Sequence, residues 1–364
     1  ALPPVSEWAF HLDLWQFPFQ LSGLCADNGQ KVTPFSSEYF TLVKPFYQLL
    51  ADAGQKVITA YIKDGAFNKG QTMVKWHEAA DGKWSFDYTG FDKFVAQMMS
   101  WGIGRQISCF SLVGWNTSIG YTDASGEART LKLTVGSDEY RTVWNEFLDS
   151  FERHLKTKGW FEKTVLYMDE IREDEMRQVV SFIKQHNPDW KIGLAGSAVS
   201  SDVESAFYDY STILGYDRTS TNAVATFYTS CAQSIPNAYV SLDNNPAEMV
   251  WVAWYAKAKG LNGFLRWAYD YWTKADPQDV RDGSNTAGDF SLIYRSDNSL
   301  SSVPLSSIRL ELLREGIQDY EKMRILSTNL MNPVVQKFTL TSGRFAGEIV
   351  TEAQGMLKKI SAEY

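Results

Sequence analysis

Lys163-Thr-Val-Leu-Tyr-Met168 has the length and apolar character of a buried strand, and an amphipathic stretch follows it over about 174–186. This order of strand and helix recurs along almost the whole chain, which is typical of βα units around a parallel sheet. The stretches that predict strands are 8–15, 56–61, 106–110, 163–168, 190–195, 210–214, 223–228 and 263–269. Eight such strands with helices between them predict an α/β fold, a TIM-like (β/α)8 barrel.

The predicted helices follow these strands. Apolar spacing and terminating glycines place them over about 37–53, 88–101, 140–158, 174–186, 246–259 and 306–330, with one more helix after Pro333. We interpret the stretch 308–323 as structural, with Arg and Glu side chains pairing at i,i+4 on a solvated face. No linker or second core is visible, so residues 1–364 are expected to form a single domain, a barrel with an extra C-terminal helix.

Composition narrows the classes of function. Acidic residues (43) outnumber basic ones (35), the net charge is −8 and no basic run occurs, which argues against a nucleic-acid partner. The sequence contains no run of 18 apolar residues, so no membrane-spanning helix is expected. The four histidines and the three cysteines (Cys25, Cys109 and Cys231) lack metal-site spacing, so no metal or other cofactor is expected; a metal held only by carboxylates is the alternative, and no motif supports it. The 13 tryptophans exceed ordinary usage, and flat rings suit sugars.

The dipeptide Asp-Glu occurs three times, at Asp138-Glu139, Asp169-Glu170 and Asp174-Glu175. The first and third lie where helices are predicted to begin, and capping or the helix dipole accounts for acidic residues there. Only Asp169-Glu170 directly follows an apolar strand, and barrel enzymes carry their active sites at the C-terminal ends of strands. Capping is the alternative for this pair too.

Neighbouring carboxyl groups do not face each other across a scissile bond, as the two carboxyls of most glycosidases do at roughly 5 to 10 Å. Asp169 and Glu170 therefore suit a mechanism in which the 2-acetamido group of the sugar supplies the nucleophile. Other strand ends provide candidate substrate-binding residues, with ordinary packing as the alternative for each aromatic ring. These candidates are His11, Asp13, Trp15, Trp115, Tyr228, Trp267, Tyr269 and Asp270.

Six stretches share the pattern of one known family. They are His11-Leu-Asp-Leu-Trp-Gln16, Ala53-Gly-Gln-Lys-Val-Ile-Thr59, Tyr167-Met-Asp-Glu170, Thr226-Phe-Tyr-Thr229, Gly263-Phe-Leu-Arg-Trp-Ala268 and 307–321. Together they resemble glycoside hydrolase family 123, whose catalytic part is also labelled a DUF4091 domain. The resemblance covers nearly the whole chain.

The resemblance implies a TIM-like barrel that cleaves β-linked N-acetylgalactosamine from glycans with retention, through an oxazoline-type intermediate. The family's usual N-terminal β-sandwich is not expected in this chain, because no such segment precedes Trp8. By the same resemblance, Asp169 orients and stabilises the acetamido group and Glu170 is the acid/base. Tyr228 is the candidate for a hydrogen bond to the acetamido oxygen.

Two other functions stay open. A glycosidase of another specificity would pair Glu170 with a distant carboxylate, such as Asp13 or Asp270, that acts as an enzyme nucleophile. A non-catalytic barrel would bind glycans through the same aromatic residues without turnover. An enzyme of this kind is expected in the periplasm, at the cell surface or outside the cell.

Overall fold

The computed structural model describes residues 2–64, 71–216, 221–238, 240–241, 243–281, 287–327 and 329–363. Eight strands form one sheet in the order β1-β14-β13-β12-β11-β10-β7-β4. They are β1 (His11–Leu14), β4 (Val57–Tyr61), β7 (Gln106–Phe110), β10 (Thr164–Asp169), β11 (Lys191–Gly196), β12 (Asp209–Ile213), β13 (Val224–Thr229) and β14 (Gly263–Arg266). A parallel bridge from Leu12 to Gln55, just before β4, links the two ends of this order. The predicted (β/α)8 barrel is confirmed.

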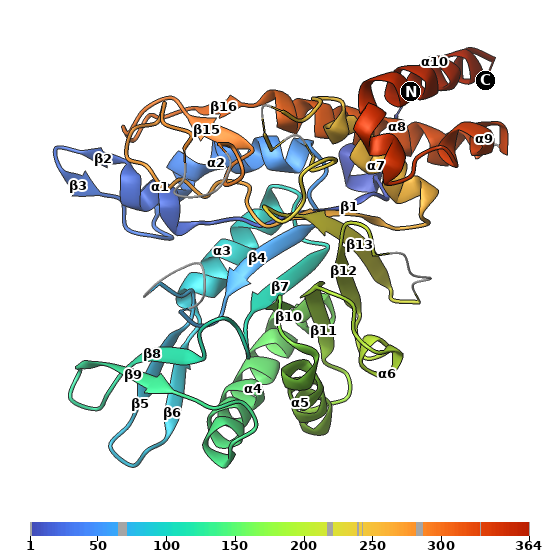
Figure 1. Cartoon of the computed structure of the whole chain (residues 1–364). Helices are drawn as coiled ribbons and strands as arrows, with labels where there is room; N and C mark the ends of the chain where they lie inside the picture. The colour runs from blue at the N-terminus through green and yellow to red at the C-terminus, as the bar shows by residue number, and fades with distance from the viewer. Residues whose placement is uncertain are drawn as a thin grey trace. The chain divides into compact units, whose positions relative to one another are not determined.

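Helices connect the strands (Figure 1). They are α1 (Phe19–Leu24), α2 (Ser37–Asp52), α3 (Thr89–Ser100), α4 (Asp138–Lys158), α5 (Glu173–His186), α6 (Ser201–Glu204), α7 (Glu248–Ala258), α8 (Ile308–Leu326), α9 (Asn332–Val335) and α10 (Ala346–Glu363). Ser36 and Ser137 cap α2 and α4, because their side chains accept the N–H groups of Tyr39 and Tyr140. None of the helices in the described ranges is long and apolar enough to cross a membrane.

The chain divides into two compact units. The first comprises Ala1–Lys56, Ser211–Ser220 and Val224–Tyr364, and the second comprises Val57–Tyr210 and Thr221–Ala223. In the first unit β14 pairs in parallel with both β1 and β13. In the second unit β4, β7, β10 and β11 pair in parallel in that order.

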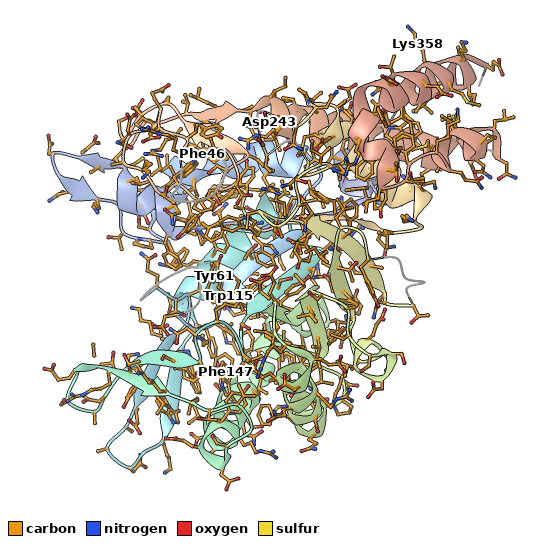
Figure 2. The ribbon with its side chains drawn as sticks, in the orientation of Figure 1. Phe46, Tyr61, Trp115, Phe147, Asp243 and Lys358 are labelled. Carbon is orange, nitrogen blue, oxygen red and sulfur yellow. The ribbon has the colours of Figure 1, made fainter. Side chains whose placement is uncertain are left out.

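The second unit also contains a small sheet that the sequence did not predict. Its strands are β5 (Lys75–Glu78), β6 (Trp84–Asp87), β8 (Ser118–Thr122) and β9 (Ala128–Lys132), in the order β6-β5-β8-β9. It lies beside α4 in Figure 1. Trp76 of β5 stacks on Phe147 of α4 with ring centroids 4.7 Å apart, and both rings are buried. This aromatic core, with Phe147 labelled in Figure 2, anchors the small sheet.

In the first unit, α7 is buried on all sides, as expected for a helix that is apolar around its circumference. It packs against α8, and Gly316 permits the close approach, since a Cβ there would lie 2.7 Å from the Val250 carbonyl oxygen. Two short strand pairs complete this unit: β2 (Ala26–Asp27) with β3 (Gln30–Lys31), and β15 (Ile293–Arg295) with β16 (Pro304–Ser306).

Several predicted boundaries are wrong for identifiable reasons. The first strand begins at His11 rather than Trp8, because the N–H groups of Ala9 and Phe10 donate to the carboxylate of Glu321 instead of the sheet. The interpretation of α8 as a solvated i,i+4 ladder is also wrong. Glu321 is buried, and ion pairs along this helix, such as Arg324 with Glu321, have i,i+3 spacing.

Two further boundaries differ. The last barrel strand ends at Arg266 rather than Tyr269. After Pro333 the helix α9 ends at Val335, and the long terminal helix α10 begins only at Ala346.

Candidate active site

The pair predicted to be catalytic lies where β10 ends. Asp169 is the last residue of the strand and pairs with Ala195 of β11, while the N–H of Glu170 donates to the Ala195 carbonyl at 2.7 Å. Glu170 has a φ of 50°, in the left-handed region, which costs a residue with a side chain about 1 to 2 kcal/mol. Backbone conformations of this kind cluster at functional sites. The turn at Glu170 therefore supports a functional role for the pair.

The other two Asp-Glu pairs lie where the sequence predicted them. Asp138-Glu139 is in the first turn of α4, behind its cap Ser137, and Asp174-Glu175 is in the first turn of α5. Negative charge is favourable at both positions because of the helix dipole. The position at the end of a strand therefore distinguishes Asp169-Glu170 from the other two Asp-Glu pairs, which lie in the first turns of helices.

The two carboxyl groups of the pair have different surroundings. Asp169 is half-buried, and loss of solvent around its carboxyl raises its pKa well above the usual value, with a smaller upward contribution from the charge of Glu170. Glu170 is exposed. A carboxyl with a raised pKa beside an exposed one is typical of sites that perform acid/base chemistry.

An aromatic row lies on the inner face of the strands beside this pair. The rings of Tyr61 on β4 and Phe110 on β7 have centroids 6.1 Å apart, and those of Phe110 and Tyr167 on β10 are 5.3 Å apart. Tyr167 precedes Asp169 by two residues, so both side chains project from the same face of β10. This row was not among the candidates predicted from the sequence, although Tyr61 and Phe110 end predicted strands and meet the same criterion as those candidates.

Trp115 lies in the segment that connects β7 with β8 and is labelled in Figure 2. Its indole N–H donates to the backbone carbonyl of Asp169 at 3.1 Å, yet 64% of the residue surface is exposed. A tryptophan whose indole nitrogen is hydrogen-bonded while most of its surface is exposed has not been placed there by core packing. The structure thus brings Trp115 to the Asp169-Glu170 pair.

In the first unit, three candidates share one face of the sheet. Asp13 of β1 and Tyr228 of β13 are both register partners of Leu265 on the central strand β14, so these three side chains project to the same side. By the same alternation His11 faces that way, whereas Trp267 lies just beyond the end of β14. His11, Asp13 and Tyr228 are buried, and Trp267 is half-buried.

The aromatic candidates of this unit are packed against other rings or held by the sheet. Trp15 is buried, and its backbone N–H donates to the backbone carbonyl of Arg266 at 3.1 Å. Trp267 makes edge contacts with Phe17 and Phe290, with centroids 6.0 Å and 4.8 Å away.

Tyr269 and Asp270 bond to neighbouring backbone and to α2. The Tyr269 hydroxyl donates to the carbonyl of Phe46, a residue labelled in Figure 2, at 2.7 Å. The carboxylate of Asp270 accepts the Phe17 N–H at 2.8 Å and the Tyr47 hydroxyl at 3.1 Å. Burial raises the pKa of Asp270 to about 7, against the lowering effect of these hydrogen bonds. Both residues lie beyond the end of β14, so strand alternation no longer directs their side chains.

Within the described ranges, no group of three or more His, Cys, Asp or Glu side chains is arranged to hold a metal ion. Cys25 and Cys109 are buried, and burial raises the pKa of each thiol. The arrangement at the end of β10 offers carboxyl groups and aromatic surface.

Comparison with known proteins adds independent information. Residues 21–326 match the model of the glycoside hydrolase 123 catalytic domain. A comparison with curated protein sequences finds no match. Among solved structures, the chain is similar to a family 123 glycoside hydrolase from Clostridium perfringens, reported in a study of glycolipid glycan hydrolysis. The TM-score is 0.88 at 24% identity, covering 100% of this chain and 71% of that chain.

A noncanonic maltogenic α-amylase, AmyB from Thermotoga neapolitana, also aligns over 88% of this chain and 77% of its own. Its TM-score of 0.45 and identity of 10% are too low to support an argument. The family model, in contrast, spans most of the sequence, including the strand that ends in Asp169. The chain therefore belongs to glycoside hydrolase family 123 and is a glycoside hydrolase.

Proposed function

We propose that this glycoside hydrolase cleaves β-linked N-acetylgalactosamine from glycans, with retention, by substrate-assisted catalysis. The observation that carries the proposal is the adjacency of Asp169 and Glu170 at the end of β10, with the chain turning between them at a positive φ. Adjacent carboxyls can act on one side of a sugar, one at the acetamido group and one at the glycosidic oxygen. They are poorly placed to flank the bond as acid and nucleophile.

The first half of the reaction closes a ring within the substrate. The acetamido carbonyl oxygen forms a bond to the anomeric carbon as the glycosidic bond breaks, and its electron pair leaves with the glycosidic oxygen. Glu170 gives its proton to that oxygen, and Asp169 accepts a hydrogen bond from the amide N–H, which becomes more acidic as positive charge develops on the ring. The intermediate is an oxazoline-type species.

The second half opens this ring with water. Glu170, now a carboxylate, takes a proton from the water as its oxygen bonds to the anomeric carbon and the acetamido oxygen departs. Two inversions at the anomeric carbon give net retention. The two carboxyls therefore need opposite charge states when substrate binds.

The raised pKa of Asp169 makes substrate binding sensitive to pH. A hydrogen bond from the amide N–H favours the ionised carboxylate, so binding of a 2-acetamido sugar lowers this pKa and is accompanied by proton release. A sugar without the acetamido group does not supply that donor. Selectivity for acetamido sugars therefore follows from the desolvation of the Asp169 carboxyl.

A panel of aryl β-glycosides, with and without the 2-acetamido group, tests the proposal. We expect turnover of N-acetyl-β-galactosaminides, retention of configuration by NMR, and inhibition by a thiazoline mimic of the cyclised intermediate. The glycan of a glycolipid is the first natural substrate to examine, because the Clostridium perfringens structure concerns glycolipid glycan hydrolysis.

Variants separate the two carboxyl roles. Asp169→Asn should reduce turnover of all acetamido substrates, whereas Glu170→Gln should lose most activity on poor leaving groups, for which protonation matters most. Glu139→Gln is the matched control, since Glu139 follows an aspartate at the exposed start of α4. Turnover of plain galactosides, or wild-type rates in both site variants, would refute the proposal in favour of an enzyme nucleophile elsewhere.

A further inference from the structure

Lys63, two residues beyond the end of β4, is a buried cation that the proposed chemistry does not use. Only 2% of its surface is exposed. Its ammonium group donates to the backbone carbonyls of Asp64 at 2.7 Å, Asn116 at 2.9 Å and Ser118 at 3.1 Å. An ammonium group has three donors, so this set satisfies all of them.

Keeping this charge away from water is costly. Burial lowers the pKa of Lys63 to about 8, although the nearby negative charge of Asp64 acts in the opposite direction. Two of its three acceptors belong to the segment between β7 and the start of β8, far from Lys63 in sequence. The hydrogen bonds that compensate for the desolvation of this ammonium group therefore also hold that segment in a fixed position.

The segment is fixed at both ends. The Tyr140 hydroxyl of α4 donates to the Leu112 carbonyl at 3.0 Å, and Lys63 holds the Asn116 and Ser118 carbonyls at the other end. The Asn116 side chain also accepts the N–H of Ser118 at 2.9 Å, which closes a local turn. Trp115 lies between these anchors.

We propose that Lys63 is a positioning residue for carbohydrate binding, which clamps the 111–118 segment so that the exposed indole of Trp115 is held beside Asp169 as a preformed stacking surface for a sugar ring. The assignment of that sugar to the substrate rests on the function proposed above. The indole N–H bond to Asp169 sets the edge of the ring, and the clamp restrains the backbone behind it. The apolar face of a pyranose can then pack on the ring without an ordering cost.

The kinetic test uses the purified full chain and the glycoside that the wild-type enzyme hydrolyses best. Lys63→Met keeps the alkyl stem and removes the donors. We expect KM to rise roughly two- to tenfold with kcat within about twofold, as for a side chain whose ordering is lost on binding. Trp115→Ala should have the same signature. The double variant should be no worse than Trp115→Ala alone, because both changes remove one interaction.

Two further variants keep the test decisive. Asn116→Ala loosens the same turn at an exposed residue and should raise KM in the same way if Lys63→Met folds poorly. Lys184→Met is the matched control. Lys184 also donates to two loop carbonyls, those of Pro188 at 2.9 Å and Trp190 at 2.7 Å, but it holds the segment that enters β11. Its loss should lower stability and leave KM unchanged.

A spectroscopic measurement is independent of turnover. In 5-fluorotryptophan-labelled protein, the ¹⁹F signal of Trp115 is assigned by its disappearance in Trp115→Phe. Lys63→Met should shift or broaden that signal, and Lys184→Met should not. An unaltered Trp115 signal, or multiplicative KM effects in the double variant, would overturn the role of Lys63. Failure to cleave any acetamido sugar would refute only the function proposed above, because the signal and the KM comparison on another glycoside remain.

Discussion

Asp270→Asn tests whether burial of an ionisable group acts as the structure indicates. The carboxylate of Asp270 accepts the Phe17 N–H and the Tyr47 hydroxyl in the interior of the first unit. Burial is the largest influence on its pKa and raises it from 3.8 to about 7. Asparagine has the same shape, keeps an acceptor for Phe17 and cannot ionise. The substitution therefore removes the charge with little change in packing.

The magnitude follows from linkage between ionisation and folding. Below pH 3.8 the Asp270 carboxyl is protonated in both the folded and unfolded states and carries no penalty. As the pH rises toward 7 the unfolded state releases its proton first, so the free energy of unfolding falls. The difference between 3.8 and about 7 corresponds to about 4 kcal/mol, reached once the pH exceeds 7.

The assay is urea unfolding of wild-type and variant protein at several pH values between 4 and 8, followed by tryptophan fluorescence. Relative to wild type, Asp270→Asn should gain about 4 kcal/mol across this range. Asp243→Asn, at an exposed residue labelled in Figure 2, is the control and should show no such trend. A difference between Asp270→Asn and wild type that does not vary with pH would refute the burial argument.

Three other predictions concern the active-site pair and the frame of the barrel. Glu170→Gln should lower the pKa of Asp169 in the free enzyme, because the negative charge of Glu170 contributes to raising it; ¹³C NMR of the Asp169 carboxyl measures this pKa, and an unchanged value would contradict the coupling. Gly263→Ala should lower the free energy of unfolding in urea by more than about 3 kcal/mol or prevent folding, since its Cβ would lie 1.9 Å from a carbonyl oxygen of β1. The control Gly355→Ala, in open space on α10, should be neutral or stabilise the protein by up to about 1 kcal/mol. Equal effects of the two substitutions would contradict the close approach at Gly263. Glu321→Ala should lower the free energy of unfolding by about 3 kcal/mol, because it strands two backbone N–H groups before β1, and a loss below about 1 kcal/mol would show that water replaces the carboxylate.

The barrel was predictable because its signal is local. A buried parallel strand reads as a short apolar run, so each of the eight strands could be located without knowledge of its neighbours. Helix starts were predictable for the same reason, since Ser137 and the acidic residues after it act within one turn. The small sheet was missed because its strands, such as Lys75–Glu78, alternate polar and apolar residues over only a few positions. These strands pack against α4, and no pattern in the sequence predicts that packing contact.

For the site, the position of the carboxyl pair was predictable from the sequence, and the surroundings of the pair were not. Chain order alone placed Asp169-Glu170 at the end of a strand and the other two Asp-Glu pairs at helix starts. The turn at Glu170 and the burial that raises the pKa of Asp169 arise from packing around β10. The substrate-binding roles of the candidates on β1, β13 and β14 stay predictions.

Sequence by itself determined the repeating βα order, the family and the position of the carboxyl pair, because each depends on residue types at fixed spacing along one chain. Tertiary structure decided which polar groups are buried and what they hold. Lys63 follows an ordinary strand and has no motif, and Asp270 follows an aromatic residue like many aspartates. Apart from the Asp64 carbonyl beside Lys63, the hydrogen-bond partners named for these two side chains come from residues about 50 to about 250 positions away. Desolvation and long-range hydrogen bonding depend on those partners, so only the folded chain reveals them.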